Sequence, residues 1–200
     1  MNRRVSSRSL DDTGELVPDS VTLVSPPPSG LDTWSGPLGI CYCEVFGGPP
    51  WNEAAHTAAR FRERLRLKSM RPGFRIVLAL EHGQILGFCY GAATLADPEL
   101  ESWYAAVTGA LGPGVTDAAL TDAFELVDLG VIPTARGRGI GSRLQDALLA
   151  GANEQRAWLM TRADATEACA FYRGHGWLEL GSFGPPDQPG QKLLMSRRLR

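Results

Sequence analysis

The chain has 200 residues, which is the length of one ordinary domain. Hydrophobic residues make up 44% of it and charged residues 21%, so it can form an apolar core. The formal net charge of -2 argues against binding to nucleic acid, because duplex binding needs a concentrated basic surface. No apolar run reaches the ~20 residues that span a bilayer, and none follows the N-terminal arginines, so we expect neither a membrane segment nor a secretory signal.

The cysteines and histidines show no metal-binding pattern. None of the four cysteines belongs to a C-x-x-C pair, and the three histidines are scattered along the chain. Zinc sites need clustered ligands, so we expect no metal. Reduced, mostly buried thiols are typical of a reducing compartment, which indicates a cytoplasmic protein.

Proline and glycine divide the first half of the chain into short elements. Residues 1–18 are polar and lack periodicity, which predicts a disordered extension before one domain over residues 19–200. A His-Gly-Gln turn at residues 82–84 joins two apolar runs, which indicates an antiparallel hairpin. The expected elements are a strand at Val21–Val24, helices at Leu38–Phe46 and Trp51–Met70, and hairpin strands at Phe74–Glu81 and Ile85–Thr94.

Residues 95–122 are polar and dotted with glycine, with one candidate helix from Pro98 to Leu111. The segment is longer than a hairpin loop, and long insertions often bind or cover a ligand. We therefore interpret it as an insertion that could serve as a substrate lid. Trp103 and Tyr104 within it could close over a substrate or anchor the insertion to the core.

The second half alternates strands and helices. This alternation, after the hairpin, implies an α/β (α+β) fold with a mixed central sheet of about six to seven strands flanked by helices. The expected elements are strands at Phe124–Ile132, Arg156–Arg162, residues 176–183 and Lys192–Leu199, and helices at Gly141–Asn153 and Thr166–Arg173.

The turn Arg-Gly-Arg-Gly-Ile-Gly at residues 136–141 follows a strand and opens a helix. Such a turn directs unpaired backbone N–H groups and the positive end of the helix dipole to one point, which suits a phosphate. The dinucleotide fingerprint is incomplete because Ser142 replaces its third glycine, and the lysine of a Walker loop is absent. A turn that binds nothing would leave the two arginines unexplained.

Two motifs in this half resemble those of the GNAT superfamily (Gcn5-related N-acetyltransferases). Arg136, Gly139 and Gly141 occupy the defining positions of its motif A, Q/R-x-x-G-x-G/A. The segment from Ala168 to Trp177 matches its A-x-x-F-Y-x-x-x-G-F/W pattern. The resemblance covers about residues 21–200, and its specific part is residues 125–177.

The resemblance implies a GNAT fold and transfer of an acetyl group from acetyl-CoA to a primary amine, with no metal. In the family the pantetheine arm pairs with the fourth strand, here through Leu129 and Val131, and Gly130 between them would mark a β-bulge. The pyrophosphate would lie on the loop, whose implied cofactor-binding residues are Arg136, Gly137, Arg138, Gly139, Ile140, Gly141 and Ser142.

Catalytic roles follow from the same resemblance. Tyr172 matches the tyrosine that protonates the departing CoA sulfur. Glu125 occupies the position of a catalytic glutamate base, with Asp128 or a water relay as alternatives. The two carboxylates lie three residues apart, so on a regular strand they face opposite sides, and a bulge would change this.

The acceptor site is least explicit. Trp51 and Glu53 could hold an amine by a cation–π contact and a charge pair, although they also suit a helix start. Trp103 is a further candidate. We expect a small-molecule amine as substrate, and dimerisation is common in the superfamily. A peptide or protein N-acetyltransferase, a non-catalytic acyl-CoA-binding module and a nucleotide-dependent oxidoreductase remain alternatives.

Overall fold

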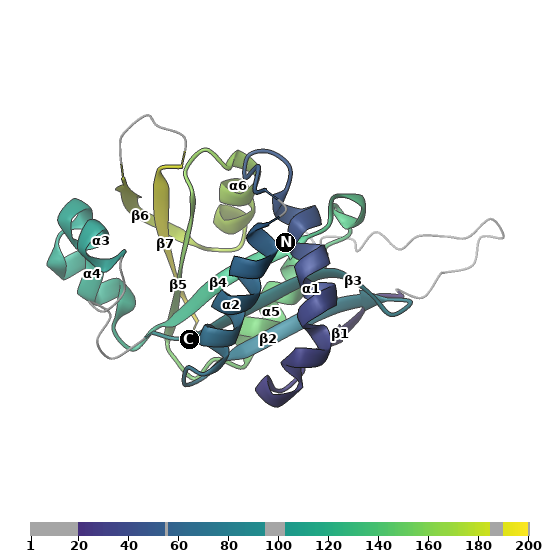
Figure 1. Cartoon of the computed structure of the whole chain (residues 1–200). Helices are drawn as coiled ribbons and strands as arrows, with labels where there is room; N and C mark the ends of the chain where they lie inside the picture. Colours follow the sequence, from purple (N-terminus) through teal and green to yellow (C-terminus); the bar gives the residue numbers. More distant parts are fainter. Residues whose placement is uncertain (1–19, 55, 95–102, 185–189, 200) are drawn as a thin grey trace, which may run out of the picture.

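A computed structural model describes residues 20–54, 56–94, 103–184 and 190–199 and shows one seven-stranded mixed sheet (Figure 1). The strand order is β1-β2-β3-β4-β5-β7-β6, and every neighbouring pair is antiparallel except β4–β5. The strands are β1 (Thr22–Val24), β2 (Arg75–Glu81), β3 (Gln84–Ala93), β4 (Phe124–Val131), β5 (Arg156–Arg162), β6 (Leu178–Phe183) and β7 (Lys192–Arg198). The predicted fold class and strand number are confirmed.

Six α-helices of the described chain cover the sheet (Figure 1). They are α1 (Leu31–Phe46), α2 (Thr57–Ser69), α3 (Tyr104–Leu111), α4 (Pro113–Leu120), α5 (Ile140–Ala150) and α6 (Thr166–Gly174). In the described residues, no helix combines the length and apolar character needed to cross a membrane. The expected N-terminal extension, residues 1–18, lies outside the described part of the chain.

Two apolar layers enclose the first half of the sheet. On one face, Leu38 of α1 and Phe61 of α2 pack with Phe88 of β3. On the other face, Leu144 and Leu148 of α5 pack against the same strands. Because helices cover both faces, β2 and β3 carry continuous apolar runs rather than alternating ones.

The helices flanking the cofactor side begin at other residues than predicted. α1 starts at Leu31 rather than Leu38 and contains Pro37. Leu31 and Leu38 lie seven residues apart, so both are buried on the same face of one helix. α2 starts at Thr57 rather than Trp51. The N–H groups of Asn52 and Glu53 bond back to the carbonyls of Gly48 and of Phe46, the last residue of α1, and so do not start a helix.

The described part of the predicted insertion forms two helices, α3 and α4, rather than one. Gly112, at φ 82°, separates them, and Pro113 begins α4. Their apolar side chains join a third core with Trp158 of β5 and Phe183 of β6. This part of the insertion therefore covers the second half of the sheet. Residues 95–102 lie outside the described chain.

Candidate active site

A cavity of about 970 Å³ opens where β4 and β5 separate. These parallel strands pair only at Phe124 with Ala157 and at Glu125 with Trp158. Beyond these pairs the β4 backbone has no strand partner on its β5 side in the described structure. The cavity wall comes from α1, the loop before α2, α2, β4, the loop before α5, β5, α6 and β7.

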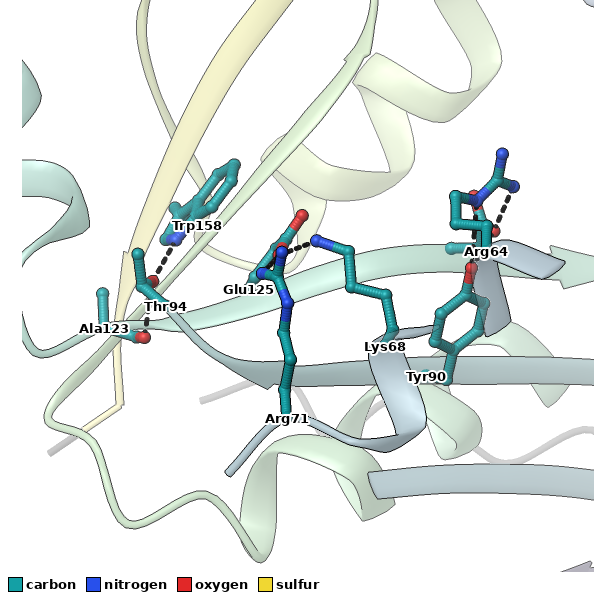
Figure 2. Close-up of polar contacts among 9 residues, drawn as sticks. Arg64, Lys68, Arg71, Tyr90, Thr94, Ala123, Glu125 and Trp158 are labelled. Atoms are coloured by element: carbon teal, nitrogen blue, oxygen red, sulfur yellow. Dashed lines mark hydrogen bonds and ion pairs between the residues drawn. The ribbon is translucent and has the colours of Figure 1, made fainter. Parts of the chain in front are cut away.

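A chain of hydrogen bonds connects the strands at the end where β4 and β5 are still paired (Figure 2). Trp158 Nε1 donates to Thr94 Oγ1 at 2.7 Å, and Thr94 Oγ1 donates to the Ala123 carbonyl oxygen at 2.7 Å. The chain therefore connects β5, the end of β3 and the start of β4. β4 and β5 are paired as far as Glu125 and diverge beyond it.

The glycine-rich loop opens into the cavity at the start of α5. Gly137 and Gly139 have φ values of 77° and 73°, which favour glycine. The first hydrogen bond of α5 runs from the Arg143 N–H to the Gly139 carbonyl, so the N–H groups that precede Arg143 in this helix have no partner within it. Cavity-lining members of the predicted phosphate loop are Arg136, Gly137, Gly139, Ile140, Gly141 and Ser142. The loop can hold a pyrophosphate.

The two loop arginines point in different directions. Arg136 lines the cavity, and its Nε donates to the Val131 carbonyl at 3.2 Å. Arg138 does not line it, because its Nη2 forms an ion pair with Glu81 Oε1 at 2.6 Å. That hydrogen-bonded ion pair lowers the pKa of Glu81 to about 2. The side-chain charge of Arg138 therefore acts on the β2–β3 hairpin.

The bulge in β4 lies at Val127 rather than at Gly130. Tyr90 of β3 pairs with Asp128, and the next residue, Gly91, pairs with Leu126, so Val127 is the extra residue of the bulge. Gly130 has another purpose, because a Cβ there would lie 2.5 Å from Val45 Cγ1 of α1. Its absence lets α1 approach β4. The predicted pantetheine residues Leu129 and Val131 line the cavity.

Tyr172 of α6 reaches the cavity from an apolar surround. It is 8% exposed and packs edge-on against Phe171 and Trp177. No hydrogen bond of its hydroxyl to another described residue is present. Burial, and to a smaller extent nearby Cys89 and Asp128, raise the pKa of the phenol well above its ordinary value. The group is therefore protonated at neutral pH and can donate.

The two β4 carboxylates lie on the same side of the sheet, where both pair with side chains of α2, because the bulge shifts their alternation. Glu125 is 5% exposed, and its Oε2 lies 2.6 Å from Lys68 Nζ and 3.4 Å from Arg71 Nη1. Burial lowers the pKa of Lys68, although Glu125 opposes this shift. Glu125 does not line the cavity.

Asp128, in contrast, lines the cavity. Its Oδ2 accepts hydrogen bonds from Arg64 Nη2 and from Tyr90 Oη, both at 2.7 Å. Its side chain is 17% exposed. Of the two candidate bases on β4, Asp128 is the one that a bound substrate could reach.

The predicted acceptor residues Trp51 and Glu53 line the same cavity. Tyr42 Oη donates to Glu53 Oε2 at 2.7 Å and accepts from Arg64 Nη2 at 3.4 Å. Trp51 lies edge-on against Phe46, with ring centroids 5.4 Å apart. Arg64 thus connects Glu53, through Tyr42, to the β4 carboxylate Asp128.

The opposite wall carries basic side chains. Lys192, at the start of β7, and Arg162 of β5 both line the cavity. Arg162 is paired with Asp164 at 2.5 Å. Burial and the charge of Arg162 lower the pKa of Lys192, against the opposing influence of Glu53. We call the wall near α1–α2 that carries Glu53 and Asp128 the acidic wall, and the wall near β5–β7 that carries Arg162 and Lys192 the basic wall. Each also holds opposite charges, Arg64 on the acidic wall and Asp164 and Glu167 beside the basic one.

Trp103 lies away from this site. Its ring packs on Trp158 with centroids 4.9 Å apart, in the core under α3 and α4. Sequence reasoning also missed Tyr42, Arg64 and Tyr90. Spacing could have indicated Arg64, because residues 64, 68 and 71 repeat a positive charge on one face of the expected helix. Among the described residues, no group of three or more His, Cys, Asp or Glu side chains could hold a metal ion.

Solved structures show the same fold at low sequence identity. A GNAT-family protein from Desulfovibrio desulfuricans superposes with a TM-score of 0.64 at 13% identity, covering 90% of this chain and 99% of its own. The ribosomal-protein-S18-alanine N-acetyltransferase of Escherichia coli gives 0.58 at 15% identity, covering 90% and 94%. The PaiA N-acetyltransferase of Thermoplasma acidophilum, solved with coenzyme A, gives 0.56 at 12% identity, covering 90% and 99%.

Sequence comparison gives the same family. A curated relative, the mycothiol acetyltransferase of Rhodococcus opacus, is 38% identical over 100 residues, covering 40% of this chain and 33% of that protein. The chain thus matches about a third of the length of this relative. The profile of the acetyltransferase (GNAT) family matches residues 42–177, which is more than half of the sequence. The chain therefore belongs to the GNAT family of acetyltransferases.

Proposed function

We propose that this protein transfers the acetyl group of acetyl-CoA to a primary amine of a small molecule. The observation that carries the proposal is one cavity that contains the glycine-rich loop, the unpaired edge of β4, Tyr172 and Asp128. The name of the curated relative, a mycothiol acetyltransferase, supports acetyl transfer.

The donor would bind along the loop and β4. The N–H groups at the start of α5 and the Arg136 side chain suit a pyrophosphate. Backbone groups of Leu129 and Val131 lie on the side of β4 that lacks a strand partner and can pair with the amides of the pantetheine arm, as an added strand would. The Val131 carbonyl already accepts from Arg136 Nε. A backbone N–H group of this part of β4 can also polarise the thioester carbonyl.

The chemistry needs one proton removed and one delivered. The neutral amine nitrogen attacks the thioester carbon, so a C–N bond forms and the C–S bond breaks. Tyr172 Oη donates a proton to the departing sulfur, and burial keeps this phenol protonated before the reaction. The proton lost by the amine balances the one that Tyr172 gives up and later regains.

Asp128 is the better-placed acceptor for the amine proton, directly or through a water. It lines the cavity, whereas Glu125 is buried between Lys68 and Arg71. The catalytic role of Glu125 stays a prediction, and its surroundings favour a structural role. A carboxylate that lies outside the cavity, in ion pairs with two side chains of the protein, is poorly placed to meet a substrate amine.

The acceptor amine would lie on the acidic wall. Glu53 and Asp128 can attract a protonated amine, and Trp51 offers an aromatic side chain beside them. The basic wall of Arg162 and Lys192 suits a polar group at the other end of the acceptor. We infer a small amine that carries further polar groups. A cytoplasmic location and a homodimer stay predictions.

An acceptor screen tests the proposal. The protein is incubated with acetyl-CoA and panels of small amines and of peptides, and free CoA thiol is measured. We expect thiol release that depends on a small amine. Release only with peptides would change the substrate class, and CoA binding without release under any acceptor would indicate a binding module. Binding of NAD without binding of CoA would overturn the proposal.

A further inference from the structure

His175, directly after α6, joins the end of α6 to the first turn of α5. Its Nε2 lies 2.8 Å from Ser142 Oγ, and its Nδ1 lies 2.7 Å from the Phe171 carbonyl oxygen. Its ring also packs on the Phe171 ring, with centroids 4.2 Å apart. Phe171 in turn lies against Gly141, where a Cβ would be 3.4 Å from its ring. We call His175, Ser142 and Phe171 the α5–α6 clasp.

The direction of these hydrogen bonds follows from the groups involved. A carbonyl oxygen only accepts, so the Nδ1 atom of His175 carries the hydrogen. In the neutral ring Nε2 then accepts, and the Ser142 hydroxyl donates to it. A serine in the first turn of a helix otherwise competes for nearby backbone groups. The clasp turns this hydroxyl away from the N–H groups that face the cavity.

The clasp joins two parts of the proposed donor site. Ser142 and Gly141 belong to the loop that would hold the pyrophosphate, and Tyr172 follows Phe171 on α6. The pyrophosphate and the sulfur of CoA are joined by an arm of fixed covalent length. Their binding groups on the protein must therefore keep a constant separation.

We propose that His175 is a positioning residue for the donor. Through Ser142 it holds the first turn of α5 against α6, so that the phosphate loop stays at its distance from Tyr172. This inference rests on the proposed function. The motif that matches here leaves position 175 open, and only the folded chain brings His175 to Ser142.

The affinity for CoA tests the clasp in a double-mutant cycle. Titration calorimetry would compare wild type, His175→Phe, Ser142→Ala and the double variant. Phenylalanine keeps a ring on Phe171 and removes both hydrogen bonds. Both single changes break the hydrogen bond between Ser142 and His175, so each should raise the Kd about 5-fold to 10-fold, and the double change should add nothing further. Ser69→Ala, at the far end of α2, serves as control and should leave the Kd unchanged.

A second pair of measurements separates positioning from general support of the fold. His175→Gln can still reach Ser142 with its amide and should restore most of the affinity, and the single variants should keep the thermal midpoint of wild type. An unchanged Kd in both single variants, independent effects in the double variant, or no recovery with Gln would overturn the clasp. Ser142→Ala removes only a hydroxyl and serves the test even if His175→Phe does not fold. Wild type that binds no CoA would instead refute the proposed function.

Discussion

Tyr172 and Asp128 meet the same cavity with opposite surroundings. Tyr172 lies among aromatic rings, which raises the pKa of its phenol, and Asp128 is held by Arg64 and Tyr90. An apolar surround favours the neutral acid form of Tyr172. Asp128 is the carboxylate of β4 that lines the same cavity, so a proton donor and a candidate proton acceptor lie in one site.

Replacement of Tyr172 by Phe should remove the proton donor and keep the packing. We expect kcat to fall about 100-fold, while the Kd for CoA changes less than about 3-fold. Since burial raises the phenol pKa, the acid form of Tyr172 should persist at alkaline pH, and wild type should lose no turnover to its ionisation up to about pH 9.5. Steady-state kinetics across pH would measure both effects. Equal kcat in the two proteins would contradict the role.

Replacement of Asp128 by Asn should lower kcat about 10-fold to 100-fold, because the amide cannot take up the amine proton. Asn keeps the shape and can still accept from Arg64 and Tyr90, so the fold should persist. Asp117→Asn, on α4, is the matched control. Full activity of the Asp128 variant would point to a water relay.

At the scale of elements, the β4 bulge and α2 act together. The bulge at Val127 brings both β4 carboxylates to the side of α2, where Arg64 and Lys68 lie one turn apart. These pairs hold α2 against the sheet. They also place Arg64 where it connects the acceptor loop to Asp128.

Replacement of Glu125 by Gln should chiefly lower stability. It leaves Lys68 and Arg71 without their carboxylate in a buried site, and breaking such a pair costs about 3 kcal/mol in the free energy of unfolding. Urea denaturation would measure this loss. The double variant Lys68→Met with Glu125→Leu should recover part of it, since it leaves fewer buried charges. Unchanged stability with lost turnover would instead support Glu125 as the base.

Replacement of Gly130 by Ala should separate α1 from β4. The new methyl group would lie 2.5 Å from Val45 Cγ1, and overpacking of this kind costs about 1–3 kcal/mol. We expect a lower thermal midpoint and a raised KM for acetyl-CoA. Adding Val45→Ala makes room and should restore much of both. If it restores neither, the close approach of α1 is not the reason for the glycine.

At the scale of the whole molecule, three apolar cores divide the work. Two cores enclose the first half of the sheet between α1–α2 and α5, and the third places α3 and α4 on β5 and β6. The cavity lies where β4 and β5 diverge between these halves. The described part of the insertion packs on β5 and β6 and so supports the β5 side of the cavity.

Replacement of Trp103 by Ala should therefore affect stability rather than kinetics. Trp103 is partly exposed and packs on Trp158, so we expect a loss of about 2 kcal/mol, below the value for a fully buried tryptophan. Chemical denaturation and acceptor KM would be measured together. A raised acceptor KM at unchanged stability would restore Trp103 to the acceptor site, as the sequence first suggested.

The sequence by itself determined the glycine-rich turn before a helix, the tyrosine on the next helix, and the order in which strands and helices follow one another along the second half of the chain. These depend on local patterns of glycine, charge and apolar periodicity, and the structure has the same elements there. Only the tertiary structure decided that Asp128 reaches the cavity, that Glu125 and Arg138 are held in ion pairs, and where the bulge lies. Strand register and charge pairing depend on residues far apart in the chain, and no local pattern encodes which partner lies within reach.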